Sequence, residues 1–401
     1  MCLQYMAAEE KGMEELELYV HIPFCKKKCS YCDFLSAPAE EDVQNAYLKQ
    51  MDKEISAVSK DYKDVSVTSV FIGGGTPSIL EASKVQHLMQ QLRTHFALAE
   101  NAEISIECNP GTLDAGKLRA YQSSGINRLS IGMQSADARE LRMLGRIHTH
   151  KQSADSYMLA REMGFKNINI DLISALPGQK ARDYERTLLE ILKLRPEHIS
   201  AYSLIIEEGT PFFEQYQKAQ LMREKGKAQS LLPSEEEERA MYVLTKELLK
   251  SEGYMRYEIS NYALDGFSCR HNIGYWTRKN YLGIGLGAAS LIENVRFSNS
   301  TDLKAYLDEE FLSEWHVHRE RLDLHAQMEE FMFLGLRMMC GVSSQEFYEQ
   351  FSRTLEEVYG AVLEKQLKKD LIKKTDRGYS LTDFGIDVSN YVMSEYLIEK
   401  S

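Results

Sequence analysis

The stretch Cys25-Lys26-Lys27-Lys28-Cys29-Ser30-Tyr31-Cys32 places three thiols in one short loop, at spacings of four and three residues. It follows a strand-like run, Tyr19-Val20-His21-Ile22. A structural zinc site would need a fourth ligand, and no CxxC or HxxxH partner stands elsewhere in the chain. An iron–sulfur cube also has four corners, so three cysteines leave one iron open to a small chelating molecule. The alternative is three cysteines that are simply buried.

The composition is that of an ordinary globular protein. A chain of 401 residues with 43% hydrophobic residues can form a large domain and a smaller one. The odd count of seven cysteines and the lack of a secretion signal favour reduced thiols and a cytosolic location. The most apolar run, Leu282 to Ile292, is too short to span a bilayer. A net charge of −12 argues against nucleic-acid binding.

Hydrophobic periodicity predicts strands that alternate with amphipathic helices from residue 16 to residue 205. The predicted strands span residues 16–24, 67–72, 103–108, 128–133, 167–173 and 198–205. The predicted helices span residues 43–60, 83–96, 113–124, 137–144, 151–163 and 183–193. Strands separated by helices of this length form a parallel sheet with right-handed crossovers. The pattern alone fits a doubly wound sheet, a full barrel or a partial barrel.

Polar or glycine residues follow most of these strands, at the edge where ligands bind to parallel sheets. Glu107, Gln134 and Asp171 each stand at a strand end, and Gly73-Gly74-Gly75-Thr76-Pro77 ends the second strand. Each polar residue taken alone could equally be a helix cap or a surface charge. The glycine run matches neither GxGxxG nor GxxxxGK[ST], which argues against a nucleoside triphosphate. Backbone exposed in this way suits a zwitterionic amino-acid group, such as that of S-adenosylmethionine (SAM).

The cysteine loop and the GGGTP segment together resemble the radical SAM superfamily. The resemblance extends over residues 16 to 390, to the subfamily that contains oxygen-independent coproporphyrinogen oxidase and the HemW-type heme chaperones. The segments that carry it are Tyr19 to Cys25, Glu107 to Pro110, Ser130 to Ser135, Leu144 to Arg146 and Asn169 to Ile173. It implies a partial (β/α)6 barrel.

The resemblance also implies the cofactor ligands. Cys25, Cys29 and Cys32 would hold a [4Fe-4S] cluster whose fourth iron binds the amino and carboxylate groups of SAM. Gly74 and Gly75 would lie along the methionine part of SAM, with Glu107 and Arg146 near its polar end. Gln134 and Asp171 would approach the ribose, and Tyr31 and Ile173 the adenine. A carboxylate suits an ammonium or a ribose hydroxyl, and an arginine suits a carboxylate. Tyr19 would face the far side of the site.

Two features indicate the chaperone branch. The oxidase branch has a further cysteine two positions after the third motif cysteine, where this chain has Phe34. The segment Cys269 to Trp276 contains HNxxYW, as the chaperone branch does. It offers His271 as a ligand for heme iron, with Tyr275 and Trp276 to pack on the porphyrin. Cys269 is a second candidate ligand. The alternative is a buried segment in which His271 is merely hydrogen-bonded.

The sequence thus predicts an N-terminal tail (1–14), a radical SAM barrel (15–295) and a mostly helical C-terminal domain (296–401). A hairpin at residues 373–382 makes that domain winged-helix-like. The predicted function is a chaperone that binds heme and passes it to acceptor hemoproteins. The alternative is a coproporphyrinogen III dehydrogenase that uses a 5′-deoxyadenosyl radical. The loop lysines suit an acidic electron donor. Dimerisation and transient membrane docking stay open.

Overall fold

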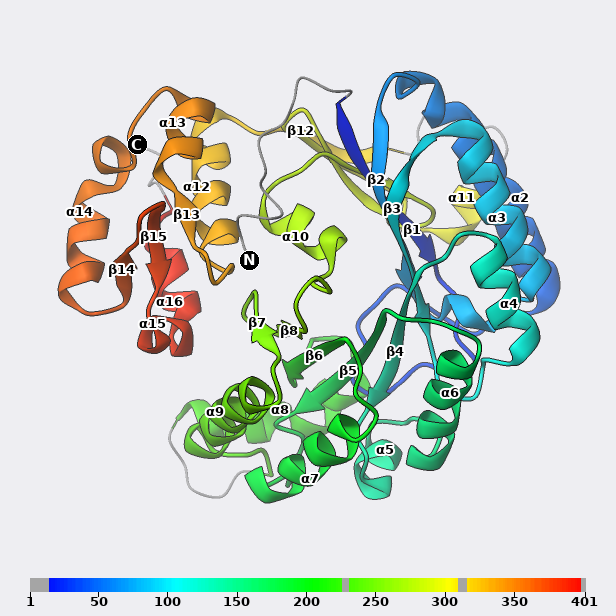
Figure 1. The fold of residues 1–401 in the computed structure, drawn as a ribbon, viewed down its shortest axis with the longest axis horizontal. Helices are drawn as coiled ribbons and strands as arrows, with labels where there is room; N and C mark the ends of the chain where they lie inside the picture. The colour runs from blue at the N-terminus through cyan, green and yellow to red at the C-terminus, as the bar shows by residue number, and fades with distance from the viewer. Residues whose placement is uncertain (1–13, 226–230, 309–315, 398–401) are drawn as a thin grey trace.

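The computed structural model describes residues 14–225, 231–308 and 316–397, so all but one residue of the predicted tail lies outside the described part. A large sheet forms the main body, and a small sheet lies in the C-terminal unit (Figure 1). The centre of the large sheet consists of six neighbouring parallel strands: β1 (Glu15–Ile22), β2 (Ser66–Gly74), β3 (Ala97–Cys108), β4 (Arg128–Gln134), β5 (Ile168–Ser174) and β6 (His198–Ser203). All six were predicted from the sequence, and their parallel pairing is confirmed.

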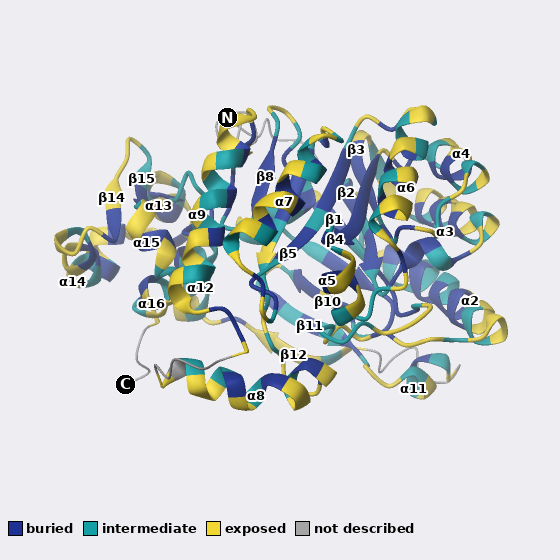
Figure 2. Ribbon diagram, turned by 90° about the horizontal axis from the view of Figure 1, so that it is seen from below, coloured by how far each residue is buried: buried dark blue, intermediate teal, exposed yellow. Residues whose placement is uncertain are grey.

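Helices between these strands cover the outer face of the sheet. They are α2 (Glu41–Val58), α3 (Ala82–His95), α4 (Ala115–Ser123), α5 (Ala138–Met143), α6 (His150–Glu162) and α7 (Ala181–Leu192). Side-chain caps start several of them: Asp114 accepts a hydrogen bond from the backbone of Lys117, and Thr149 forms a capping box with Gln152. In Figure 2 the central strands of the sheet are mostly buried, while the helices expose their outward sides.

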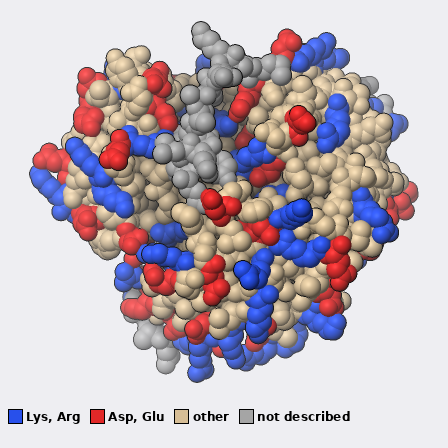
Figure 3. Space-filling model, viewed as in Figure 1, with Lys and Arg blue, Asp and Glu red and all other residues tan. Residues whose placement is uncertain are grey.

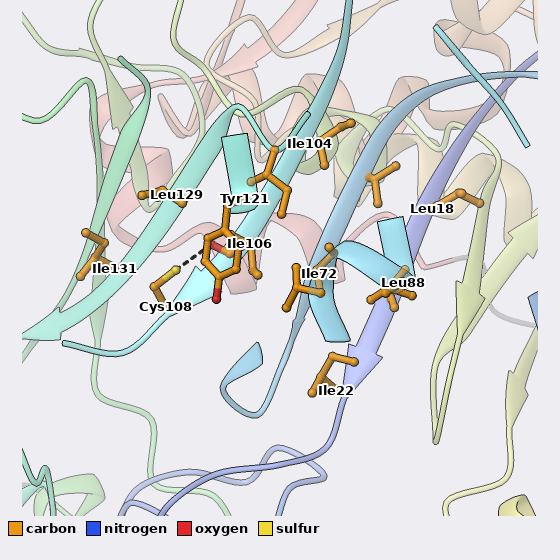
Figure 4. Close-up of a cluster of buried hydrophobic side chains, with 14 of the residues drawn as sticks. Leu18, Ile22, Ile72, Leu88, Ile104, Ile106, Cys108, Tyr121, Leu129 and Ile131 are labelled. Atoms are coloured by element: carbon orange, nitrogen blue, oxygen red, sulfur yellow. Dashed lines mark hydrogen bonds between the residues drawn. The ribbon is translucent and has the colours of Figure 1, made fainter. Parts of the chain in front are cut away.

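The outer face of the strands is the main hydrophobic core. Residues at every second position, such as Leu18, Ile72 and Ile106, are fully or almost fully buried. Figure 4 shows these side chains beside Leu88 of α3 and Tyr121 of α4. Because side chains alternate across a strand, the intervening positions face the inside of the barrel.

The large sheet continues beyond the six predicted strands on both sides. Beside β1 come β9 (Tyr281–Ile284), β10 (Ala289–Ile292), β11 (Val295–Asn299) and β12 (His316–Arg321). Beside β6 come β8 (Asn261–Ala263) and β7 (Met255–Arg256). The order ends at β12 and β7 without closure, which confirms a partial barrel. The sheet also extends past the expected domain boundary at residue 296, as far as Arg321.

Four further helices belong to this body: α8 (Pro211–Glu224), α9 (Glu235–Ser251), α10 (Arg270–Trp276) and α11 (Leu303–Leu307). The acidic start of α9 is capped by Ser234, whose side chain accepts from the backbone of Glu237. The helix α10, which carries the HNxxYW segment, lies between the barrel and the C-terminal unit in Figure 1.

The C-terminal unit has its own core and a three-stranded antiparallel sheet. Its elements are α12 (Leu324–Gly335), β13 (Val342–Ser343), α13 (Ser344–Phe351), α14 (Leu355–Lys368), β14 (Ile372–Lys374), β15 (Gly378–Leu381), α15 (Asp383–Asp387) and α16 (Ser389–Ser394). The predicted hairpin is β14–β15, and helices dominate the unit, so the winged-helix-like expectation is confirmed. Glu258 and Met338 form a backbone bridge between the two bodies.

The described helices include none that is long and apolar enough to cross a membrane. On the face shown in Figure 3, basic and acidic side chains are mixed.

Candidate functional site

The cysteine loop leaves the carboxyl end of β1 and is held by backbone hydrogen bonds to distant parts of the chain. The amide of Cys25 donates to the carbonyl of Ala37 at 3.1 Å, and the amide of Ser30 donates to the carbonyl of Leu144 at 3.0 Å. The carbonyl of Ser30 in turn accepts from the amide of Phe212 at 2.9 Å. The loop is therefore anchored before any cofactor binds.

Polar donors point at two of the thiols. Nη1 of Arg146 lies 3.5 Å from Sγ of Cys29, and Oγ1 of Thr76 lies 3.5 Å from Sγ of Cys25. Nη2 of Arg146 also donates to Asn109, whereas Nε is buried without a partner. Burial raises the pKa of Cys32. A cation beside a thiolate favours its charged form, which is the form that binds iron.

The donor set fits a cluster rather than a single ion. Within the described ranges, no three His, Cys, Asp or Glu side chains converge closely enough to ligate one metal ion. A [4Fe-4S] cluster places each of its thiolate ligands on a different iron, so its ligands stand farther apart. The three loop cysteines supply the three thiolates that such a cluster would need, and the guanidinium of Arg146 lies beside one of them.

The glycine run at the end of β2 forms a backbone surface with no room for side chains. Gly74 has a φ of +107°, and a Cβ there would lie 2.4 Å from the ring of His21. A Cβ on Gly75 would lie 2.6 Å from the carbonyl oxygen of Phe24. The amide of Gly74 donates to Oε2 of Glu107 at 2.9 Å. This close approach is the physical reason for glycine at both positions.

Glu107 is an uncharged acid at neutral pH in this state. Burial, assisted by the charge of Asp171, raises the pKa of Glu107 to about 8. Asp171 accepts hydrogen bonds from Ser130 at 3.1 Å and from Asn169 at 2.7 Å, and burial raises its pKa too.

The residues expected around the ribose and adenine stand at the same edge. Gln134 has a φ of +67°, at an irregularity in the pairing of β4 with β5. A non-glycine residue in this region is held there by its surroundings, as is common at ligand sites. Ile173 belongs to an apolar cluster with Leu144 and Phe212, and Tyr31 packs against that cluster. An adenine would find both side chains on one apolar surface.

A cavity of about 520 Å³ opens inside the barrel below this edge. Predicted site residues line it: Tyr19, Gly74, Glu107, Asp171 and Tyr275. The hydroxyl of Tyr19 is 3.0 Å from Nδ1 of His21. Phe34, at the position that distinguishes the two branches, also lines the cavity and is 59% exposed. Phe34, which follows the cysteine loop, thus lines one cavity together with Gly74 and the two carboxylates, whereas the three cysteines do not line it.

His271 lies behind the cavity wall rather than in it. Its side chain is 1% exposed, with Nδ1 2.8 Å from Oγ of Ser69 and Nε2 3.2 Å from the hydroxyl of Tyr275. Its ring stacks on Phe71 at 5.3 Å between centroids. Burial lowers the pKa of His271 to about 3, so the imidazole is neutral. Both ring nitrogens are occupied in this state.

Tyr275 and Trp276 do not line the same cavity. Tyr275 lines the barrel cavity, whereas Trp276 lines a second cavity of about 680 Å³ between α10 and the C-terminal unit. Successive residues of a helix point about 100° apart, which separates the two rings. The expectation that both rings pack on one porphyrin is not met in this state. Cys269 is fully buried, and Sγ lies 3.4 Å from Glu103.

Sequence reasoning missed the polar lining on the inner face of the barrel. The buried inward residues include Glu17, Glu103, Arg128, Asn169, His198 and Ser200. The sequence does indicate this polar lining, because polar residues recur at every second position of these strands, as in Asn169-Ile170-Asp171 and His198-Ile199-Ser200.

Comparisons with known proteins agree with this geometry. The model of the radical SAM superfamily matches residues 19–191, and the model of the HemN C-terminal domain matches residues 322–388. The solved structure of coproporphyrinogen III oxidase (HemN) from Escherichia coli, a radical SAM enzyme, superposes with a TM-score of 0.81 at 23% identity. The superposition covers 100% of this chain and 93% of that one, and it shows a shared fold. The protein is of the radical SAM class.

Two curated relatives define the family within that class. The chain is 34% identical to the heme chaperone HemW of Lactococcus lactis subsp. lactis (strain IL1403), over 95% of this chain and 97% of that protein. It is 35% identical to the heme chaperone HemW of Bacillus subtilis (strain 168), over 95% and 99%. The chain therefore belongs to the HemW family, which confirms the resemblance drawn from the sequence.

We predict that Cys29→Ala abolishes iron binding. Loss of one thiolate removes a corner of the cluster, so iron and sulfide content after anaerobic reconstitution should fall to near background. Cys108→Ala is the matched control, because Cys108 is buried in the hydrophobic core and should cost only about 1 kcal/mol of stability. Equal iron content in the two variants would contradict the assignment of the loop.

Proposed function

We propose that this protein is a heme chaperone, which binds heme and transfers it to acceptor hemoproteins. The observation that carries the proposal is the identity of about a third to heme chaperones of the HemW family along nearly the whole chain. Phe34 and the HNxxYW segment support the same branch.

The cofactor site is assigned on the chemistry of its residues. Cys25, Cys29 and Cys32 would hold the [4Fe-4S] cluster, and Arg146 donates to the sulfur of Cys29. A cluster held by these three thiolates would supply an iron site for the amino and carboxylate groups of SAM. The backbone of Gly74 and Gly75, the carboxylates of Glu107 and Asp171, and the side chains of Gln134, Tyr31 and Ile173 bind the rest of the molecule. Tyr19 closes the far side.

The alternative function is that of a coproporphyrinogen III dehydrogenase. It shares the fold and the cofactor loop, so the fold does not separate the two functions. The difference lies at position 34, where an exposed phenyl group lines the cavity and offers no thiol chemistry.

The other expectations stay predictions. They are a cytosolic location, an acidic electron donor for the lysines of the loop, homodimerisation, transient membrane docking and the absence of nucleic-acid partners.

We predict that the affinity for SAM rises with pH between about 6 and 8. The pKa of Glu107 is raised to about 8, so this acid must lose a proton before it can accept, as a carboxylate, a hydrogen bond from the amino group of SAM. Affinity should therefore rise by up to about tenfold per pH unit below that pKa and then level off. Equilibrium dialysis of the reconstituted protein measures it.

The control for this prediction is Glu107→Gln, which keeps the acceptor for the amide of Gly74 but has no charge. It should bind SAM weakly and without this pH dependence. A wild-type affinity that is constant from pH 6 to pH 8 would show that Glu107 does not contact the amino group of SAM as a carboxylate.

We predict that His271→Ala weakens heme binding and leaves the absorbance of the cluster intact. If His271 ligates the iron, it must first leave Ser69 and Tyr275, and its loss should change the optical and electron paramagnetic resonance spectra of bound ferric heme. Tyr275→Phe is the control, because it removes only the hydroxyl that holds His271. An unchanged heme titration of His271→Ala would exclude His271 as a ligand of the heme iron.

The proposed function is tested by the kinetics of heme transfer. Heme-loaded protein is mixed with an apo-hemoprotein, and the rate is followed while the acceptor concentration is varied. Direct transfer makes the rate rise with acceptor concentration, whereas passive release gives a constant rate. Anaerobic conversion of coproporphyrinogen III to protoporphyrinogen IX, in the presence of reductant and SAM, would instead establish the alternative enzyme.

A further inference from the structure

Arg128 is a fully buried cation with unsatisfied donors. It is the first residue of β4, its side chain is 1% exposed, and it lines the barrel cavity. A guanidinium has five N–H donors in a fixed fork. The acceptor found for them is Oγ of Ser105, 3.5 Å from Nη1, and the buried Nε has no partner. Within the described ranges, no carboxylate lies within 4.0 Å of this guanidinium.

The nearby carboxylates are committed to other donors. The carboxylate of Glu103 accepts hydrogen bonds from Sγ of Cys269 and from the backbone amides of Arg270 and His271. Asp171 accepts from Ser130 and Asn169, as described above. Glu17 and Glu107 also face the barrel, and burial raises the pKa of each to about 8, so neither is a full negative charge at neutral pH.

A comparison with Arg161 shows what a structural arginine looks like in this protein. Its Nη2 lies 2.6 Å from Oε2 of Glu197, and its Nε donates to the hydroxyl of Tyr157 at 2.9 Å. Arg128 is more deeply buried and has far fewer partners. Because a buried, unsatisfied charged donor is costly, the fold retains Arg128 for an acceptor that is not part of the chain.

The acceptor that suits this fork is a carboxylate, which binds an arginine through two parallel hydrogen bonds. The SAM carboxylate is held at the cysteine loop, beyond the carboxyl ends of the strands. Arg128 pairs with Ser105, two residues before Glu107 on β3, so it lies roughly 7 Å deeper in the barrel than Glu107. Heme carries two propionates on flexible arms, and Asn272 and Tyr275 of the HNxxYW segment line the same cavity as Arg128.

We infer that Arg128 binds a propionate carboxylate of heme inside the barrel cavity. This inference rests on the proposed heme-chaperone function and adds the group that recognises the ligand. It places a propionate beside Arg128, with Tyr275 on the cavity wall, and leaves the carboxyl edge of the barrel to SAM.

The test compares heme with its dimethyl ester, in which both carboxylates are blocked. Each is titrated, in detergent, into the reconstituted wild-type protein, Arg128→Gln and Arg128→Lys. The wild type should bind heme at least about tenfold more tightly than the ester. In Arg128→Gln the preference should fall below about twofold, and Arg128→Lys should recover part of it. The wild-type comparison needs no substitution, so a lack of preference for heme over the ester would refute the inference even where a variant fails to fold.

Arg161→Gln is the matched control, since it removes a paired arginine on α6 and should keep the full preference for heme. Cluster absorbance and SAM binding are measured in parallel. A wild-type protein that binds heme and the ester equally would overturn the inference, as would Arg128→Gln with its preference intact. Loss of SAM binding in Arg128→Gln, with heme preference unchanged, would assign the carboxylate to SAM instead. A wild-type protein that binds neither heme nor the ester would refute the proposed function itself.

Discussion

The alternation of side chains along the six parallel strands gives the sheet two chemically opposite faces, and the site depends on that alternation. Outward positions such as Leu18, Ile106 and Ile170 are buried against helices. Inward positions carry polar groups such as Arg128 and His198, each also buried. A closed (β/α)8 barrel fills its interior with branched apolar side chains. Here the polar interior leaves a cavity, because buried polar groups need partners and cannot simply interdigitate.

The carboxyl edge of the same strands explains why the cofactor residues are so far apart in sequence. Four strands each end at this edge with a residue or segment that we propose for the cofactor site: the cysteine loop after β1, the glycine run at the end of β2, Glu107 on β3 and Gln134 on β4. The cysteine loop is also held in place by the fold. The loop is tied by backbone hydrogen bonds to Ala37, Leu144 and Phe212, so its thiols are positioned by the fold before the cluster is assembled. Preorganisation of this kind lowers the entropy lost on binding.

The six strands, the loop and the strand-end residues could be predicted because long, strongly periodic segments carry their own signal. The flanking strands β7 to β11 were missed, since strands of two to five residues are too short to show a period and form through pairing with neighbours. The six-residue strand β12 lies in the range that was expected to be mostly helical. The direction of side chains on α10 was equally out of reach. Whether Tyr275 or Trp276 meets the barrel depends on how that helix is rotated, which tertiary packing sets. Arg128 was missed as well, because an arginine at the first residue of a strand shows no sign in the sequence that its side chain is buried.

The packing of α10 limits what its histidine can do. A Cβ on Gly274 would lie 2.1 Å from the carboxylate of Glu17, so the helix rests directly on β1. His271 is fixed to β2 through Ser69 and to its own helix through Tyr275. Iron ligation by His271 would have to break both contacts, uncovering Glu17, whose Oε2 is already unpartnered. The segment therefore packs against β1 and β2 in this state, with Asn272 and Tyr275 at the cavity, and release of its histidine requires α10 to move.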